Sequence, residues 1–288
     1  MKILSRMLKV DDIKFPPLSI DNINDPIALT RALCKTSGTV RESGYKYPRA
    51  SSIDGSCARE WVFGITSDLK RTEFIHFPLL MVFGIGSAIH KYYQNSTVLF
   101  PNIVGEWKCK NCQYISSFGV RPLGNCPKCG ADNSLFRYKE HYFTMSDPFY
   151  ATGKIDLFLP VGNPVRYRIA DIKGVADDKT EPRGGDIMQL ASYLLCSKYD
   201  DTMPQEVDHT TGYLFYISKK MSFKAPVRTI KVTLTREIED TLMNFYMQVK
   251  RGVDEDMIPP KLVNCKNKEC PFKVQCNEHG DRNDFAGA

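Results

Sequence analysis

Two aspartates and one lysine are spaced as in sites that activate water with a metal ion. Asp156 lies in a run of alternating apolar residues, and Asp171-Ile172-Lys173 lies in the next such run. On adjacent strands, the two carboxylates can hold Mg²⁺ or Mn²⁺ through oxygen, and Ile172 can add its backbone carbonyl. Residues 171 and 173 point to the same side of a strand. The ammonium of Lys173 would therefore lie beside a metal-bound water and help to orient or deprotonate it.

A second kind of chemistry comes from the cysteines, of which the chain has 10. Four of them form two pairs with two-residue spacers: Cys109, Cys112, Cys126 and Cys129. This pattern is typical of a tetrahedral Cys₄ zinc ribbon, because each short spacer lets both thiolates of a pair face one ion. Gly130 permits the tight backbone that such a knuckle needs.

Three further cysteines lie near the C-terminus at wider spacings: Cys265, Cys270 and Cys276. Three thiolates do not close a tetrahedral site, so a fourth ligand has to come from elsewhere. The candidates for this ligand are Cys34, Cys57, Cys196 and His279. The wide spacers suit a [4Fe-4S] cluster, while a Cys₃His zinc site would satisfy the same ligand count. Spacing alone leaves both open.

The elements that must position these residues follow from the spacing of the apolar side chains. Helical periodicity predicts helices over 77–93, which carries His90, over a stretch that opens at Gly184, and over 236–251. Alternation predicts a hairpin and then three more strands, over 135–145, 150–159, 166–173, 212–218 and 227–234. This order of elements predicts an α/β core with a mixed sheet.

The composition is that of a folded, soluble protein. The 288 residues are 42% hydrophobic and 25% charged, with a formal net charge of +6, which excludes disordered and collagen-like chains. The longest apolar stretch, 77–89, is broken by proline and glycine and is shorter than the ~18 residues that a membrane span needs. The N-terminus lacks the apolar core of a secretory signal. We therefore expect a cytoplasmic protein without a membrane partner, whose reduced thiols bind metal.

Four motifs occur in a fixed order along the predicted elements. They are Gly86-x3-His90 on the first helix, Gly153-Lys154-Ile155-Asp156 and Asp171-Ile172-Lys173 on strands, and Gln189-x3-Tyr193 on the following helix. With these motifs the chain resembles the PD-(D/E)xK nuclease superfamily. Within it, the chain is most similar to the RecB-like branch, which includes the AddB subunit and the CRISPR-associated RecB-like exonucleases. The resemblance covers residues 50–277.

The resemblance implies a restriction-endonuclease-like fold, in which a mixed central sheet is flanked by helices. It also implies three ligands for a catalytic Mg²⁺ or Mn²⁺: His90, Asp156 and Asp171. In such a site Lys173 would be the catalytic lysine, and Gln189 and Tyr193 would support the lysine and the substrate. Glu140, one strand before Asp156, matches an acidic position of the family less closely.

The resemblance bears on the C-terminal cysteines as well. Iron-sulfur members of this branch have one cysteine upstream of the nuclease core, in a Cys-x-Arg-like pattern, and three downstream of it. Cys57-Ala58-Arg59 matches the upstream pattern. The resemblance therefore implies that Cys57 joins Cys265, Cys270 and Cys276 around one [4Fe-4S] cluster, which would staple the C-terminal tail to an N-terminal helix.

These observations predict five segments. They are an N-terminal arm (1–49), a helical part with the first cluster cysteine (50–104), an inserted zinc ribbon (105–134), the nuclease core (135–253) and the C-terminal cysteine segment (254–288). Basic and aromatic residues suit the arm for phosphate contact and base stacking: Lys35, Arg41, Tyr45, Lys46, Tyr47 and Arg49.

The sequence thus predicts a metal-dependent DNA exonuclease that acts on single-stranded DNA or duplex ends in recombination, repair or replication. A helicase or recombination protein is the expected further partner. Two alternatives are a non-catalytic nucleic-acid-binding or assembly module on the same fold, and a structure-directed endonuclease. The intact set of Asp156, Asp171 and Lys173 favours an enzyme, because a decayed site usually loses one of these groups. No separate sequence-reading segment is visible, which disfavours a restriction-type enzyme.

Overall fold

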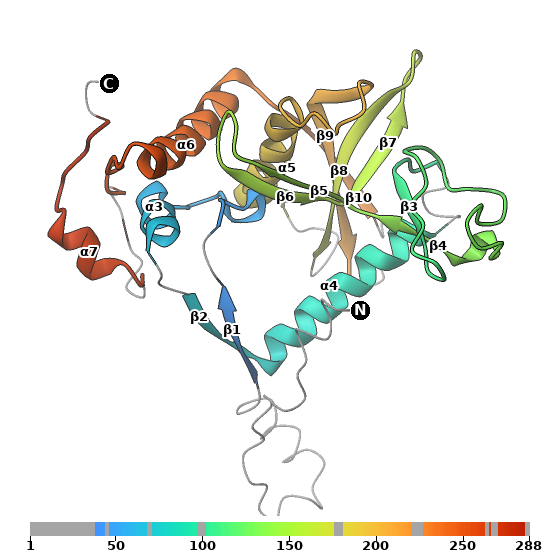
Figure 1. Ribbon diagram of the computed structural model, residues 1–288, viewed down its shortest axis with the longest axis horizontal. Coiled ribbons are helices and arrows are strands. Elements are labelled where there is room, and N and C mark those ends of the chain that lie inside the picture. The colour runs from blue at the N-terminus through green and yellow to red at the C-terminus, as the bar shows by residue number, and fades with distance from the viewer. Residues whose placement is uncertain are drawn as a thin grey trace, which may run out of the picture. The chain divides into compact units, whose positions relative to one another are not determined.

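The computed structural model describes residues 38–43, 46–67, 71–96, 102–175, 181–219, 227–262, 265 and 270–285 (Figure 1). Most of the predicted arm 1–49, including Cys34, Lys35 and Tyr45, lies outside these residues. The chain divides into two compact units, residues 1–44 with 69–88, and residues 45–68 with 89–288.

The first unit contains two antiparallel strands, β1 (Gly38–Ser43) and β2 (Arg71–His76). Helix α4 (Phe77–Asn95) follows β2 directly, and its residues up to 88 belong to this unit. The remainder of α4, which carries His90, belongs to the second unit. The helix predicted over 77–93 is therefore confirmed. In the described part of the chain, none of the helices combines the length and the apolarity that crossing a bilayer requires.

The second unit is built on a four-stranded mixed sheet with the strand order β10-β9-β8-β7. The strands are β7 (Leu157–Val161), β8 (Arg166–Val175), β9 (Val207–Ser218) and β10 (Val227–Thr233). β7 and β10 lie antiparallel to their neighbours, whereas β8 and β9 are parallel and are connected through helix α5 (Gly184–Ser197). The predicted mixed α/β sheet is thus confirmed.

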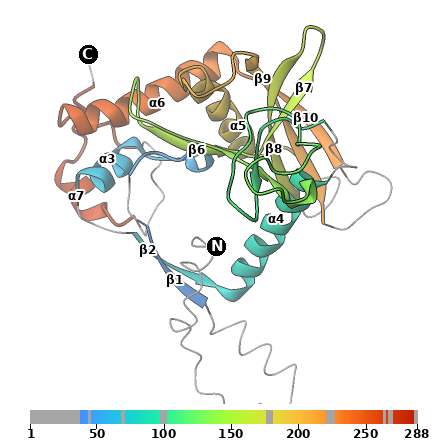
Figure 2. The same cartoon turned by 45° about the vertical axis from the view of Figure 1, so that its right-hand side comes forward.

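A hairpin of β5 (His141–Met145) and β6 (Ala151–Ile155) precedes this sheet, and its tip lies beside helix α6 (Figure 2). The two strands predicted for it are each interrupted once. The first divides at Glu140, since β4 (Phe136–Lys139) pairs with β3 (Glu106–Cys109) instead of with the hairpin. The second divides at Asp156. The part before it, β6, pairs with β5, and the part after it, β7, pairs with β8. Both acidic residues stand where a strand changes its partner.

Helices cover one face of the sheet. α5 and α6 (Arg236–Asp254) contribute Leu190, Leu194, Leu242 and Tyr246, which pack on Ile169 and Leu214 of the sheet. Thr235 caps α6, its Oγ1 accepting a hydrogen bond from the backbone N–H of Ile238. Because each large apolar side chain contributes about 1.5–3 kcal/mol when fully buried, this layer fixes β8 and α5 firmly against each other.

The opposite face of the sheet is covered by the predicted ribbon and the end of α4. Leu157, Ile172 and Phe215 of the sheet share one buried cluster with Trp107 and Phe136, and Ile89 of α4 packs against it. A short 3-10 helix, η4 (Asn133–Leu135), leads into β4. The ribbon, predicted as an accessory insertion, therefore shares a hydrophobic core with the sheet.

The remaining elements are three short helices. They are the 3-10 helix η3 (Ala50–Ser52), which packs against α5 and β6, and the helices α3 (Ala58–Thr66) and α7 (Lys273–Glu278). α3 packs against α6, and Phe63 of α3 is buried with Phe272 just before α7. Segments from the two ends of this unit thus form a small core of their own.

Candidate functional site

The two aspartates face each other across neighbouring strands, as predicted. Leu157 is the register partner of Ala170, which places Asp156, just before β7, opposite Asp171 of β8. Both carboxylates are buried, with Asp156 6% and Asp171 2% exposed. Oδ2 of Asp156 accepts a hydrogen bond of 2.9 Å from the backbone N–H of Ile172 and lies 3.3 Å from Nδ1 of His90. The bend at Asp156 therefore aims its carboxylate at the helix α4.

Three ligand-type side chains gather at this bend. Donor atoms of His90, Glu140 and Asp156 all lie within 4.8 Å of one another, a spacing that suits one metal ion. Glu140 is oriented by Nε2 of Gln94, which donates to its Oε1 at 2.7 Å, and by an ion pair with Lys154. The structure thus places Glu140, the least closely matching residue of the sequence prediction, beside His90 and Asp156.

Asp171 is turned towards Lys173 instead of towards this group of three. Its Oδ2 lies 3.0 Å from Nζ of Lys173, and its Oδ1 accepts a hydrogen bond of 3.2 Å from Nε2 of Gln189. The same Gln189 accepts a 2.7 Å hydrogen bond from Lys173 through Oε1 and donates one of 2.8 Å to the hydroxyl of Tyr193. The predicted lysine, glutamine and tyrosine therefore form one connected network around Asp171.

The backbone carbonyl of Ile172 was predicted as a further metal ligand. Its side chain is fully buried in the core between sheet and ribbon, and its N–H is used by Asp156. The role of its carbonyl as a metal ligand therefore stays a prediction from the sequence.

The electrostatics of the site favour a bound cation. Burial and the nearby charge of Asp156 raise the pKa of Asp171 to about 7. Oδ2 of Asp171 is buried and accepts no well-aligned hydrogen bond, despite its ion pair with Lys173. Burial alone would lower the pKa of Lys173, but Asp171, Asp186 and Asp156 raise it overall. A divalent cation would relieve the repulsion between the two aspartates, and carboxylate and imidazole donors fit Mg²⁺ or Mn²⁺.

Four residues that support this network were not identified from the sequence. Gln94 also donates to the carbonyl of Asp156 at 3.1 Å, and Asp186 lies 3.8 Å from Nζ of Lys173. Tyr216 holds Asp186 through a 2.5 Å hydrogen bond, while Lys154 holds Glu140. The helical spacing contained a signal for two of them. Gln94 follows His90 by four residues and Asp186 precedes Gln189 by three, so each shares a helix face with a predicted site residue.

The ribbon cysteines form a compact tetrahedral arrangement. Sγ of Cys109 lies 3.9 Å from that of Cys129, and Sγ of Cys112 lies 3.5 Å from that of Cys126. A tetrahedral zinc site with bonds of about 2.3 Å requires sulfur atoms about 3.8 Å apart. The chain turns back after each pair at Gln113 and Gly130, which have positive φ values of 64° and 69°. These four thiols form a site that can hold a metal ion.

One ribbon thiol is already poised as a thiolate. The side-chain amide of Asn111, whose Nδ2 lies 3.4 Å from Sγ of Cys129, and the backbone of Ala131 lower the pKa of Cys129 to about 6. Since the thiolate is the form that binds metal, the lowered pKa of Cys129 favours metal binding.

Zinc removal should loosen the whole ribbon. Replacing Cys126 and Cys129 together by serine is expected to release about one zinc ion per chain, measured by elemental analysis. Because the ribbon core is continuous with the sheet, the variant should also unfold at a lower temperature. If the protein has the nuclease activity that the sequence predicts, this activity should persist in part, since none of the ribbon cysteines belongs to the group formed by His90, Glu140 and Asp156. A folded variant without any activity would show that the ribbon belongs to the active site.

The C-terminal cysteines line a separate cavity of about 300 Å³. Cys57, Cys265, Cys270 and Cys276 all contribute to its wall. Within the described residues, no three of these thiols come within 4.8 Å of one another, unlike the ribbon thiols. In this structure the four thiols therefore share a cavity but not the close spacing of the ribbon thiols.

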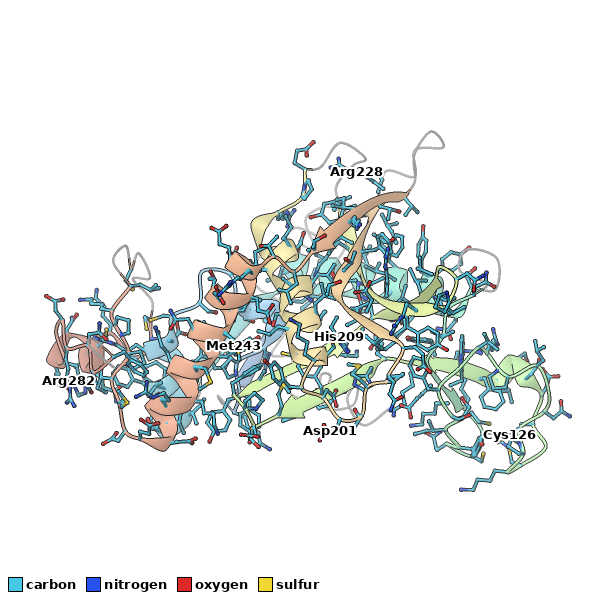
Figure 3. The ribbon with its side chains drawn as sticks, turned by 90° about the horizontal axis from the view of Figure 1, so that it is seen from above. Cys126, Asp201, His209, Arg228, Met243 and Arg282 are labelled. Carbon is cyan, nitrogen blue, oxygen red and sulfur yellow. The ribbon has the colours of Figure 1, made fainter. Side chains whose placement is uncertain are left out.

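Two other candidate ligands, Cys196 and His279, are described by the structure and do not line this cavity. Cys196 is fully buried in the core formed by α5 and α6, and the ring of His279 stacks on Phe63 with centroids 5.6 Å apart. Figure 3 shows Cys126 of the ribbon and Arg282 of the C-terminal segment at opposite ends of the second unit. The two cysteine sites are therefore separate.

Arg59 of α3 connects the cavity to the C-terminal segment. Its fully buried guanidinium donates hydrogen bonds to the carbonyls of Pro259 at 2.8 Å, Gly280 at 2.9 Å and Arg282 at 2.5 Å. Its Nη1 also lies 3.5 Å from Sγ of Cys276. Arg59 thus satisfies several backbone carbonyls that the cavity wall would otherwise leave unpaired.

Comparison with known proteins does not assign the chain to a family. No protein-family model matches it, and no curated protein does. A solved structure titled "Crystal structure of SSO0001" is similar to it with 19% sequence identity and a TM-score of 0.26. The aligned region covers 48% of this chain and 56% of that chain. The function must therefore be inferred from the site itself.

Proposed function

We propose that the protein is a divalent-metal-dependent nuclease with a restriction-endonuclease-like core. It hydrolyses phosphodiester bonds of DNA as an exonuclease on single strands or duplex ends, in recombination, repair or replication. The observation that carries this proposal is the convergence of two groups on adjacent strands. His90, Glu140 and Asp156 form an ion-sized cluster, and beside it Lys173 forms an ion pair with Asp171 and a hydrogen bond to Gln189.

The residues divide the chemistry between them. His90, Glu140, Asp156 and Asp171 would hold Mg²⁺ or Mn²⁺, which lowers the pKa of water and polarises a phosphoryl oxygen when bound. Lys173, held by Asp171 and Gln189 and kept protonated by its raised pKa, would orient the attacking water through its ammonium group. Tyr193 fixes the amide of Gln189, so that Gln189 can accept from Lys173 and donate to Asp171 at the same time.

The accessibility of the site supports an enzyme over the non-catalytic alternative. The side chains of His90 and Lys173 are 28% and 22% exposed, so both can contact solvent and a substrate. Oδ2 of Asp171 is buried and forms an ion pair with Lys173 but no well-aligned hydrogen bond, so a bound cation would give this oxygen a further partner. Such a group is costly to bury unless it has a further partner.

The two cysteine sites complete the proposal. The ribbon thiols hold Zn²⁺, supported by sulfur spacings that match a tetrahedral ion. The C-terminal cavity holds a [4Fe-4S] cluster through Cys57, Cys265, Cys270 and Cys276, supported by their shared cavity and wider separation. Both metals would stabilise the fold, since the cysteines that would bind them are separate from the group formed by His90, Glu140 and Asp156.

A cleavage assay on end-labelled linear DNA and on circular DNA tests the function. The purified protein should degrade the linear strand from its end in Mg²⁺ or Mn²⁺ and leave the closed circle intact. Chelation should stop the reaction. Cutting of the circle would instead support the structure-directed endonuclease, and binding without cleavage of either DNA would support the non-catalytic module. A helicase or recombination protein as partner, and a cytoplasmic location, remain predictions from the sequence.

A further inference from the structure

The β5–β6 hairpin has one polar face whose side chains are exposed within the described part of the chain. Phe143, Met145 and Ile155 point inward and are buried, whereas Tyr142, Thr144 and Lys154 point outward. The side chain of Tyr142 is 66% exposed, which is unusual for a ring at the centre of a hairpin. An exposed aromatic face of this kind is available for stacking.

Uncompensated cations lie beside this ring. The segment that precedes η3 runs along β6, since the carbonyl of Pro48 accepts a 2.9 Å hydrogen bond from Thr152 and Arg49 forms a parallel bridge to the same residue. Lys46 and Arg49 are exposed, and among the described residues neither has an ion-pair partner. Both are close enough to act on Tyr142, whose pKa is lowered by hydrogen bonds with Thr144 and Thr152 and by these two charges.

The ring of Tyr47, predicted from the sequence as a stacking residue, is engaged within the protein. It stacks on Tyr150 with centroids 5.1 Å apart, and Lys250 covers the ring of Tyr150 at 4.9 Å. Among the described residues, the aromatic group left open near Lys46 and Arg49 is therefore Tyr142.

The polar face leads directly to the candidate active site. Tyr142 is the register partner of Lys154, and the ammonium of Lys154 pairs with Glu140 of the ligand group. Opposite residues of an antiparallel pair have Cβ atoms about 5 Å apart. The exposed ring thus stands one side chain away from the residues proposed to hold the metal ion.

We propose that this face, formed by Lys46, Arg49, Tyr142 and Lys154, binds an unpaired nucleic-acid strand on its way to the active site. One base stacks on Tyr142, while Lys46 and Arg49 contact phosphates. A duplex keeps its bases stacked inside, so it can use the cations but not the ring. The inference rests on the proposed nuclease function and deepens it by naming a single strand as the substrate.

Fluorescence anisotropy without added Mg²⁺ or Mn²⁺, with labelled oligothymidylate and a labelled duplex of the same length, tests this binding mode. Tyr142→Ala should weaken binding of the single strand about tenfold and leave duplex binding unchanged, because stacking on one aromatic ring contributes that much. Tyr142→Phe should bind like the wild type, since the ring is retained. Arg49→Ala should flatten the salt dependence of single-strand binding by a slope of about 0.7.

Tyr92→Ala is the matched control, because this tyrosine is 65% exposed on α4 and lies outside the hairpin. It should leave single-strand binding unchanged. Wild-type binding by Tyr142→Ala, equal losses for single strand and duplex, or an equal loss in Tyr92→Ala would each overturn the inference.

Cleavage measured in parallel separates this inference from the proposed function. If the wild type degrades DNA while Tyr142→Ala binds and cleaves normally, the stacking surface is wrong and the nuclease stands. If the wild type binds a single strand through Tyr142 and cleaves nothing in Mg²⁺ or Mn²⁺, the surface is supported and the nuclease is wrong.

Discussion

Lys173→Ala is expected to lower the rate of DNA cleavage at least about 100-fold, the usual contribution of a positioned proton-transfer group. Nζ of Lys173 lies 3.0 Å from Oδ2 of Asp171 and 2.7 Å from Oε1 of Gln189, so no solvent cation can take its place with the same geometry. The fold should persist, because Asp171, with its pKa already raised to about 7, can bind a proton once the lysine is gone. Initial rates on end-labelled DNA measure the effect.

The control for this variant is Lys198→Ala. Lys198 pairs with Glu239 at 2.6 Å and its side chain is 27% exposed, close to the 22% of Lys173. The Lys198→Ala variant should cleave DNA at the wild-type rate. Asp156→Ala and Asp171→Ala should also lose cleavage and, in addition, bind Mn²⁺ more weakly by calorimetry. Undiminished cleavage by Lys173→Ala would remove the basis of the site assignment.

The second large effect concerns the C-terminal cavity. Protein purified without oxygen should be brown, with iron and sulfide near four per chain, and Cys270→Ala should lose the colour. The proposed cluster would close a loop that begins at Cys57 and ends at Cys276, and cross-links across such long loops restrict the unfolded chain strongly. We therefore expect the unfolding temperature of Cys270→Ala to fall by at least about 5 °C.

Two further variants make this test specific. Cys196→Ala removes a fully buried thiol that does not line the cavity, so it should retain iron and colour. Cys57→Ala distinguishes the cluster from the Cys₃His zinc alternative. A [4Fe-4S] cluster requires this thiol, whereas a colourless wild type with about two zinc ions, unaffected by Cys57→Ala, would establish the alternative.

The elements that local periodicity specifies could be predicted from the sequence. The inward stripe of α5 and the alternation of β8 depend on neighbouring residues, so the positions of Lys173, Gln189 and Tyr193 followed from spacing. The ribbon cysteines were found for the same reason, because each knuckle is a local turn.

Changes of strand partner could not be predicted in this way. Alternation describes which side chains share a face and not which strand lies alongside, so the breaks at Glu140 and Asp156 left no trace in the pattern. These breaks are what bring Glu140 beside His90. The carbonyls bound by Arg59 were equally hidden, since they lie about two hundred residues further along the chain.

The shared core changes the interpretation of the ribbon. Trp107 and Phe136 bury the face of the sheet that carries Ile172, and Ile172 adjoins both Asp171 and Lys173. A ribbon that has lost its metal would leave this face partly exposed. The ribbon is thus part of the support for the site, although it supplies none of the chemical groups.

The position of Arg59 and Cys57 has a consequence for the order in which the chain folds. Contacts such as those between β8, α5 and β9 join neighbouring segments and can form early, whereas Arg59 and Cys276 are 217 residues apart and meet only when everything between them is in place. We therefore expect the cavity to form after these local contacts, and a molecule that had not formed them would lack it. The amount of metal bound there would then record, molecule by molecule, how many chains had reached the native state.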